Sequence, residues 1–251
     1  MKQENRIRRM PAAALALGGV CLALRLGLYA VAVDEKGLLL RGHPLEKILW
    51  AVAAAACLLV ALVVWRREGS DRYEENFAPS AGAAFGHFLL AGGIALTVLT
   101  NVPGVFGTLG FVWKLLGLLS VPLLLWAGVC RLRGKKPLFL IHSVLCVFLL
   151  IHIMNQYQRW CGNPQLMDYV FALLGSMMLA FFAYYTAAFE AGCANPRMHL
   201  LSGLLAVLLC TGALSGAEFP LLYLGGTAWA LTDLCRQQPP PEGEGSAYDA
   251  A

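Results

Sequence analysis

Long apolar segments separated by short polar loops run along the chain from residue 10 to residue 233. Eight of these segments approach the length of about 20 residues that a helix needs to cross the hydrocarbon of a bilayer. The pattern predicts an all-α, polytopic transmembrane helix bundle of about eight spans, within one integral membrane domain at residues 1–236. The expected spans are 10–33, 48–65, 83–101, 109–130, 138–155, 168–189, 198–215 and 219–233.

The last two segments are short and allow two arrangements. The runs 200–214 and 219–231 are separated only by residues 215–218. Two tilted helices joined by a tight external turn is the favoured interpretation. The alternative is a re-entrant hairpin with Glu218 at membrane depth, which would mark a cavity because non-helical backbone there must lie against protein or water. Both return the chain to the same side, where residues 237–251, rich in Pro, Gly and acidic residues, are expected to form a disordered tail.

Lys and Arg are concentrated in every second loop. Thirteen lie on one side of the predicted membrane and four on the other, while Arg25 and Lys114 lie within segments. Short basic loops stay in the cytoplasm, so we expect a plasma-membrane protein with both termini cytoplasmic. External loops are then expected at 34–47, 102–108, 156–167 and 216–218. The thirteen cytoplasmic residues are Lys2, Arg6, Arg8, Arg9, Arg66, Arg67, Arg72, Arg131, Arg133, Lys135, Lys136, Arg197 and Arg236.

The composition excludes several classes of protein. Only 14% of the residues are charged, whereas soluble domains have about 25%, and no polar stretch is long enough to form a separate soluble domain. The lipid bilayer is therefore the expected partner. Nucleic-acid binding is not expected, because the basic residues are divided among membrane-facing loops. Only Cys161, of eight cysteines, falls in an external loop, so the sequence predicts no disulfide framework.

Polar and cationic side chains gather in the predicted outer half of the membrane. At 1.5 Å per helical residue, Arg25 lies ~12 Å and Lys114 ~8 Å from the outer ends of their segments. Four further residues of the fifth segment, spaced by 3, 4 and 7 positions, share one helical face. One hypothesis is a site for an anionic or amide-bearing small molecule; the other is that the cations reach the headgroups and the polar helix ends meet the interface. The candidate ligand-binding residues are Arg25, Lys114, His152, Asn155, Gln156 and Arg159.

Three histidines, His87, His142 and His199, lie at one depth in the predicted cytoplasmic half. Three imidazoles at one depth could bind a transition metal or relay protons. However, no carboxylate shares their sequence spacing, so each histidine is expected to form a hydrogen bond between helices, and no metal site is assigned.

Gly82, Gly86 and Gly93 form a stripe of small residues on the third segment. Such stripes are typical of helices that pack closely in membranes. The stripe would bring His87 near another helix, although it does not identify which one.

No motif in the sequence assigns an activity. His-Glu-x-x-His, Gly-x-Ser-x-Gly and Walker patterns are missing, so catalysis is not indicated and no cofactor is predicted. We expect a multispanning membrane protein that is a small-molecule transporter or the membrane subunit of one, working as a homo-oligomer or with a membrane partner protein. The alternative is an accessory or signalling membrane protein that binds a partner through its small-residue stripes and basic loops.

Overall fold

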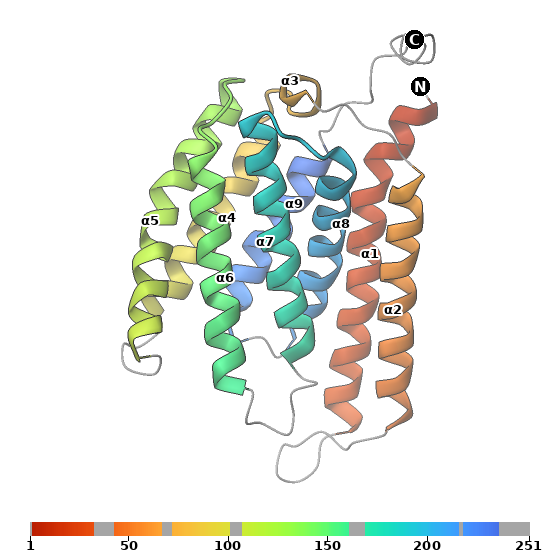
Figure 1. Cartoon of the computed structure of the whole chain (residues 1–251). Helices are drawn as coiled ribbons and strands as arrows, with labels where there is room; N and C mark the ends of the chain where they lie inside the picture. The colour runs from red at the N-terminus through yellow and green to blue at the C-terminus, as the bar shows by residue number, and fades with distance from the viewer. Residues whose placement is uncertain are drawn as a thin grey trace.

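The computed structural model describes residues 2–32, 43–66, 72–100, 107–160, 169–215 and 218–235, without the side chains of residues 2–8, 75, 107, 108, 159 and 160. This part of the chain is a bundle of helices without strands (Figure 1), which confirms the predicted fold class. The predicted tail at 237–251 lies outside the described residues. The helices are α1 (Lys2–Val31), α2 (Pro44–Trp65), α3 (Tyr73–Asn76), α4 (Ala81–Thr100), α5 (Gly107–Leu132), α6 (Leu140–Trp160), α7 (Val170–Ala191), α8 (Pro196–Ala213) and α9 (Pro220–Leu234).

Large apolar side chains cover the outside of the bundle. Leu58, Leu62 and Trp65 on α2, Leu99 on α4 and Phe111 on α5 are all more than half exposed. A continuous apolar surface of this kind is unfavourable in water and favourable in hydrocarbon. Seven of the helices are also long and apolar enough to cross a membrane. The chain is therefore a multi-pass membrane protein whose outer surface contacts lipid.

Helix α9 runs beside α4, and side chains at both of its ends contact α5. Phe219, just before α9, lies 5.8 Å from the ring of Trp113 near the start of α5. Asp233, near the end of α9, forms an ion pair with Arg131 near the end of α5. This course supports two antiparallel helices rather than a re-entrant hairpin, even though α9 has only 15 residues.

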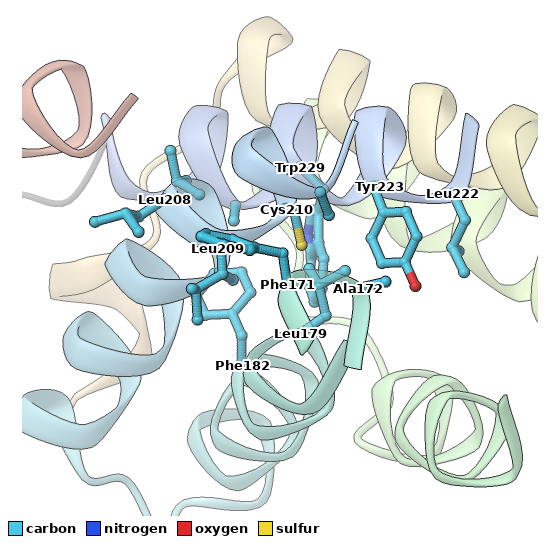
Figure 2. Close-up of a cluster of buried hydrophobic side chains, with 14 of the residues drawn as sticks. Phe171, Ala172, Leu179, Phe182, Leu208, Leu209, Cys210, Leu222, Tyr223 and Trp229 are labelled. Atoms are coloured by element: carbon cyan, nitrogen blue, oxygen red, sulfur yellow. The ribbon is translucent and has the colours of Figure 1, made fainter. Parts of the chain in front are cut away.

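Helices α8 and α9 occupy the middle of the bundle. Helix α8 packs against α1, α2, α7 and α9, and α9 packs against α4, α8 and, less closely, α7 and α1. Among its main neighbours in the described part, α2 contacts only α1 and α8. Figure 2 shows the apolar core where α7, α8 and α9 meet, with Phe171, Phe182, Cys210 and Trp229 among the buried side chains. Polar residues on α9 are consequently placed in the protein interior and away from lipid.

Glycines allow the backbones of α4 and α9 to approach each other closely. A Cβ at Gly86 would collide with Thr232, a Cβ at Gly93 with the Leu221 carbonyl, and one at Gly225 would lie 2.8 Å from the Cα of Leu90. The predicted stripe is thus confirmed at Gly86 and Gly93, which face α9. Gly82, in contrast, meets only a side chain of its own segment at 3.6 Å.

The turn between α7 and α8 sets the positions of two residues considered below. Gly192 ends α7 in the left-handed conformation, with φ at 83°, which glycine adopts without strain. The Asn195 side chain then accepts a hydrogen bond of 3.2 Å from the Met198 amide at the start of α8. This tight turn places Glu190 and His199 at the same end of the bundle.

The start of α1 and the end of α9 also lie at that end (Figure 1). Arg66, Arg133 and Lys135 follow helix ends on this side, and Arg197 lies in the first turn of α8 on the same side. The paired ends agree with an even number of crossings. That this side faces the cytoplasm stays a prediction from the charges.

Candidate functional site

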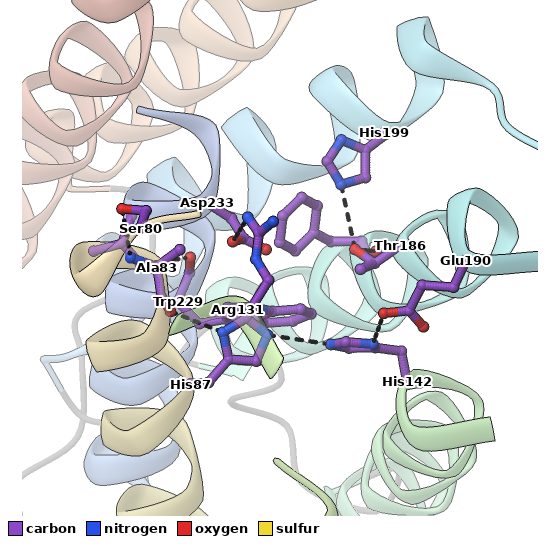
Figure 3. A network of polar contacts seen from close by, with 12 residues as sticks. Ser80, Ala83, His87, Arg131, His142, Thr186, Glu190, His199, Trp229 and Asp233 are labelled. Atoms are coloured by element: carbon purple, nitrogen blue, oxygen red, sulfur yellow. Dashed lines mark hydrogen bonds and ion pairs between the residues drawn. The ribbon is translucent and has the colours of Figure 1, made fainter. Parts of the chain in front are cut away.

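Six helices place polar side chains at one buried level near the end of the bundle where α1 begins (Figures 1 and 3). None of these side chains is more than 5% exposed. Ionisable groups inside a membrane protein are costly to bury, so a concentration of them marks a functional-site candidate. We call this group the histidine cluster; its members are His87, Arg131, His142, Glu190, His199, Trp229 and Asp233.

An ion pair joins α5 to α9 within the histidine cluster. Nη2 of Arg131 donates to Oδ1 of Asp233 at 2.7 Å. The same guanidinium lies 4.7 Å from the centre of the Phe77 ring. Opposite charges at this separation offset the cost of removing both from water, provided that both partners are present.

A second chain of contacts joins α9, α4, α6 and α7. Nδ1 of His87 lies 2.8 Å from the carbonyl oxygen of Ala83, and Nε2 of His87 lies 3.2 Å from Nε1 of Trp229 and 3.3 Å from Nε2 of His142. Nδ1 of His142 then lies 2.8 Å from Oε1 of Glu190. This last contact has ion-pair distance without hydrogen-bond alignment, and neither atom has a hydrogen-bond partner among the described residues.

The segment containing α3 covers the histidine cluster at the end of the bundle. The ring of Phe77 lies edge-on to His199, with centroids 5.4 Å apart. The Tyr73 hydroxyl lies near the guanidinium of Arg131; burial raises the pKa of Tyr73 above its ordinary value, and the nearby guanidinium lowers it only in part. Tyr73 is therefore a neutral phenol, and its segment separates the charged groups from the surface.

The three predicted histidines all contact another helix, as expected. His87 and His142 contact each other, whereas His199 lies 3.2 Å from the hydroxyl of Thr186 on α7. Within the part of the chain that the structure describes, no three or more His, Cys, Asp or Glu side chains are grouped to hold a metal ion.

Carboxylates accompany the histidines in the structure, although none shares their sequence spacing. Glu190 contacts His142, and Asp233 lies in the same cluster. Glu190 lies on α7 and Asp233 on α9, far along the chain from His142 on α6 and His87 on α4, so spacing along the chain could not reveal these contacts. The sequence feature that could have indicated these acids is that each stands as a single acidic residue near one end of an otherwise apolar segment.

A second buried polar group lies further along α9, around Tyr223. Its hydroxyl accepts a hydrogen bond of 3.1 Å from Nε2 of Gln156 and lies 3.0 Å from Oγ of Ser176. With a helical rise of 1.5 Å per residue, Tyr223 and Asp233 are about 15 Å apart along the axis of α9. Helix α9 therefore carries polar side chains at two separate levels.

His152 and Asn155 lie on the same buried face of α6 as Gln156. They are 1% and 6% exposed, and the His152 ring packs against Phe219 with centroids 5.2 Å apart. Nε2 of His152 and Nδ2 of Asn155 have no hydrogen-bond partner among the described residues. Such buried polar atoms are costly unless a water or a ligand completes them. The Tyr223 cluster is defined here as His152, Asn155, Gln156, Ser176 and Tyr223.

Arg25 lies inside the protein and does not extend into lipid. It is 4% exposed, and its guanidinium donates to the Gly212 carbonyl at 3.0 Å and to the Tyr29 hydroxyl at 3.3 Å. Gly212 belongs to the last turn of α8, where carbonyl groups lack helical partners and carry partial negative charge. The end of α8 thus provides an acceptor for this cation.

The remaining cations of the predicted ligand site are not gathered around Arg25. Lys114 is partly exposed on α5, which packs against α4 and α6, whereas α1 packs against α2, α8 and α9. The side chain of Arg159 lies outside the described residues. The structure therefore brings together His152, Asn155 and Gln156, while Arg25 and Lys114 lie on helices that do not pack together. Ligand binding by any of the six stays a prediction.

Comparisons with known proteins add no assignment: no protein-family model, no curated protein and no solved structure matches the chain. The two buried polar clusters are therefore the basis for a functional interpretation.

Proposed function

We propose that the protein is a small-molecule transporter, or the membrane subunit of one, and that the Tyr223 cluster is its substrate site. The observation that carries the proposal is the pair of polar atoms, His152 Nε2 and Asn155 Nδ2, buried without a hydrogen-bond partner among the described residues. The Asn155 amide is a donor. Its natural complement is an oxygen acceptor, such as the carboxylate or amide oxygen of a small molecule.

The arrangement of the helices supports the same interpretation. Transporters commonly bind substrates near the middle of the bilayer on short or interrupted helices. Helices α8 and α9, of 18 and 15 residues, are shorter than the other long helices of the described part and lie at the centre of the bundle. The polar side chains of α9 therefore border the region where a substrate would cross.

We propose an anionic substrate and an outward-facing position for the Tyr223 cluster. Arg25 and Lys114 contribute positive charge to the half of the bundle that also contains Tyr223. That half faces outward if the basic helix ends face the cytoplasm, which would also place both termini inside the cell at the plasma membrane. A homo-oligomer or a membrane partner protein is part of the proposal, because a bundle of this size needs a second body to move against.

The test compares ligand stabilisation in matched variants. Purified protein is screened by thermal shift against small organic carboxylates and phosphate monoesters, and the compounds that stabilise it are then tested for uptake by proteoliposomes. A ligand at 100 times its Kd should stabilise the folded protein by about 2.7 kcal/mol. Asn155→Ala should lose this stabilisation.

Met154→Ala is the control, because Met154 precedes Asn155 and is 50% exposed on the lipid-facing side. It should keep both ligand stabilisation and uptake. Equal stabilisation of wild type, Asn155→Ala and Met154→Ala would contradict the assignment of the site. Failure of every compound in the screen to stabilise the wild type would contradict the proposed substrate class.

A further inference from the structure

The hydrogen-bond directions around His87 determine where its proton lies. The Ala83 carbonyl can only accept, so Nδ1 of His87, at 2.8 Å, must carry a hydrogen. The indole nitrogen of Trp229 can only donate, so Nε2 of His87, at 3.2 Å, must be an acceptor. His87 is consequently a neutral imidazole with its single proton on Nδ1.

This tautomer of His87 fixes the state of His142. The two Nε2 atoms are 3.3 Å apart, and that of His87 has no hydrogen, so Nε2 of His142 must donate. A neutral His142 then has a bare Nδ1, which lies 2.8 Å from Oε1 of Glu190. Two lone pairs at that distance repel each other. A further proton must therefore lie on one of these two atoms.

We infer that His142 and Glu190 form a proton-binding site, which is oriented by His87 and Trp229 (Figure 3). The bound proton lies on Nδ1 of His142, as an imidazolium beside a carboxylate, or on Oε1 of Glu190, as a carboxylic acid beside a neutral imidazole. Both forms give the pair a net charge of zero. Loss of the proton leaves the pair with one negative charge, and no other bond is made or broken.

The surrounding charges favour the state in which the pair holds its proton. Within the histidine cluster the only full positive charge belongs to Arg131, which is already bound to Asp233 at 2.7 Å. The cluster is therefore neutral when the proton is bound and carries one uncompensated negative charge when it is not, which is costly in a buried site. The other titratable or charged groups around the pair are Tyr73 on α3, His87 on α4, Cys130 and Arg131 on α5, Arg133 and Lys135 directly after α5, His199 on α8 and Asp233 on α9.

Glu190 also gives the site a route to one side of the membrane. It is the next-to-last residue of α7, and Ala191 and Gly192 directly after it are exposed at the end of the bundle. Its second oxygen, Oε2, has no hydrogen-bond partner among the described residues. Proton exchange is therefore expected with water at this end and not through the Tyr223 level.

The site does not depend on the proposed transport activity, so its test uses no substrate. Full-length protein carrying isotope-labelled histidine is placed in lipid nanodiscs, and nitrogen chemical shifts are followed with pH alongside the infrared carboxyl bands. His87→Gln and His142→Gln assign the two histidine signals. We expect His87 to be the neutral Nδ1–H tautomer, and the His142–Glu190 pair to hold one proton at neutral pH.

Glu190→Gln should remove the bound proton and leave His142 neutral, because the Gln amide can donate to Nδ1 without a bound proton. Glu74→Gln is the matched control, since Glu74 is an exposed glutamate on α3, and it should keep the proton bound by His142 and Glu190. A His87 proton on Nε2, or a neutral His142 beside an ionised Glu190 at neutral pH, would overturn the inference. Both of these outcomes are measured on the wild type and stand even if Glu190→Gln does not fold. Failure of the transport assay alone would leave the proton site intact.

Discussion

Removing one member of the Arg131–Asp233 pair should destabilise the protein far more than removing both. The charged groups lie 2.7 Å apart, and their side chains are 3% and 1% exposed. Breaking such a buried pair costs about 3–5 kcal/mol, because the remaining charge loses its partner without regaining water. For Asp233→Ala we expect the lower end, about 3 kcal/mol, since Tyr73 and the Phe77 ring still contact the guanidinium.

The double variant isolates the electrostatic part of this cost. Arg131→Met keeps a long side chain without charge, and on its own it leaves Asp233 buried and unpaired. Arg131→Met combined with Asp233→Ala leaves no charge behind. Its stability should lie within about 1 kcal/mol of wild type, because replacing a whole buried pair by apolar groups is often neutral or stabilising. The two substitutions should therefore be strongly non-additive.

Unfolding by SDS in mixed micelles, followed by far-ultraviolet circular dichroism at one pH, gives the free energy of unfolding for all four proteins. Single variants that cost less than about 1 kcal/mol would match an exposed salt bridge and would refute the assumption that the pair is desolvated. A double variant as unstable as the two single variants together would refute the charge argument.

Three further predictions concern packing, protonation and topology. Gly86→Ala should lower the midpoint of thermal unfolding, because the added methyl meets the α9 backbone. Gly92→Ala should be neutral or stabilising, because a Cβ there meets nothing within 4 Å. Equal effects of the two substitutions would contradict the close approach of α4 and α9. Because burial raises the pKa of Tyr73 in the folded protein, the free energy of unfolding should decline as pH rises above the ordinary tyrosine value of 10.0, and Tyr73→Phe should decline less over the same range of a pH titration. An impermeant thiol reagent added to intact cells should label Cys161, and it should label Cys235 only after permeabilisation; labelling of Cys235 from outside would overturn the topology.

The long helices could be predicted because a bilayer imposes a minimum apolar length on each of them. Helix α3, Tyr73–Asn76, could not be predicted in the same way. It has four residues in a charged loop, and it is held by contacts of Tyr73 and Phe77 with Arg131, which is more than fifty positions away. Such a contact depends on how α4 and α5 fold back, which apolar periodicity does not encode.

Depth along each segment was sufficient to place the three histidines at one level, but not to identify their neighbours. The contact between His142 and Glu190 requires that α6 and α7 pack together, and the contact between His87 and Trp229 requires that α4 packs on α9. Arg131 is a second residue whose neighbours in space could not be identified from the sequence. It stands beside basic loop residues in the chain, so the sequence places it among the residues that orient the protein in the membrane. In the folded protein it is buried beside Asp233 instead.

The glycine contacts between α4 and α9 have a mechanical consequence. Because backbone meets backbone at Gly86, Gly93 and Gly225, neither helix can slide or rotate against the other without a steric clash, so the two must move as one rigid body. His87 and Trp229 belong to that body, whereas His142 and Glu190 belong to α6 and α7. A displacement of the α4–α9 pair relative to α6 and α7 changes the distance between the two histidines. The position of the α4–α9 pair and the protonation of His142 and Glu190 are then thermodynamically coupled, so that a change in either one shifts the other.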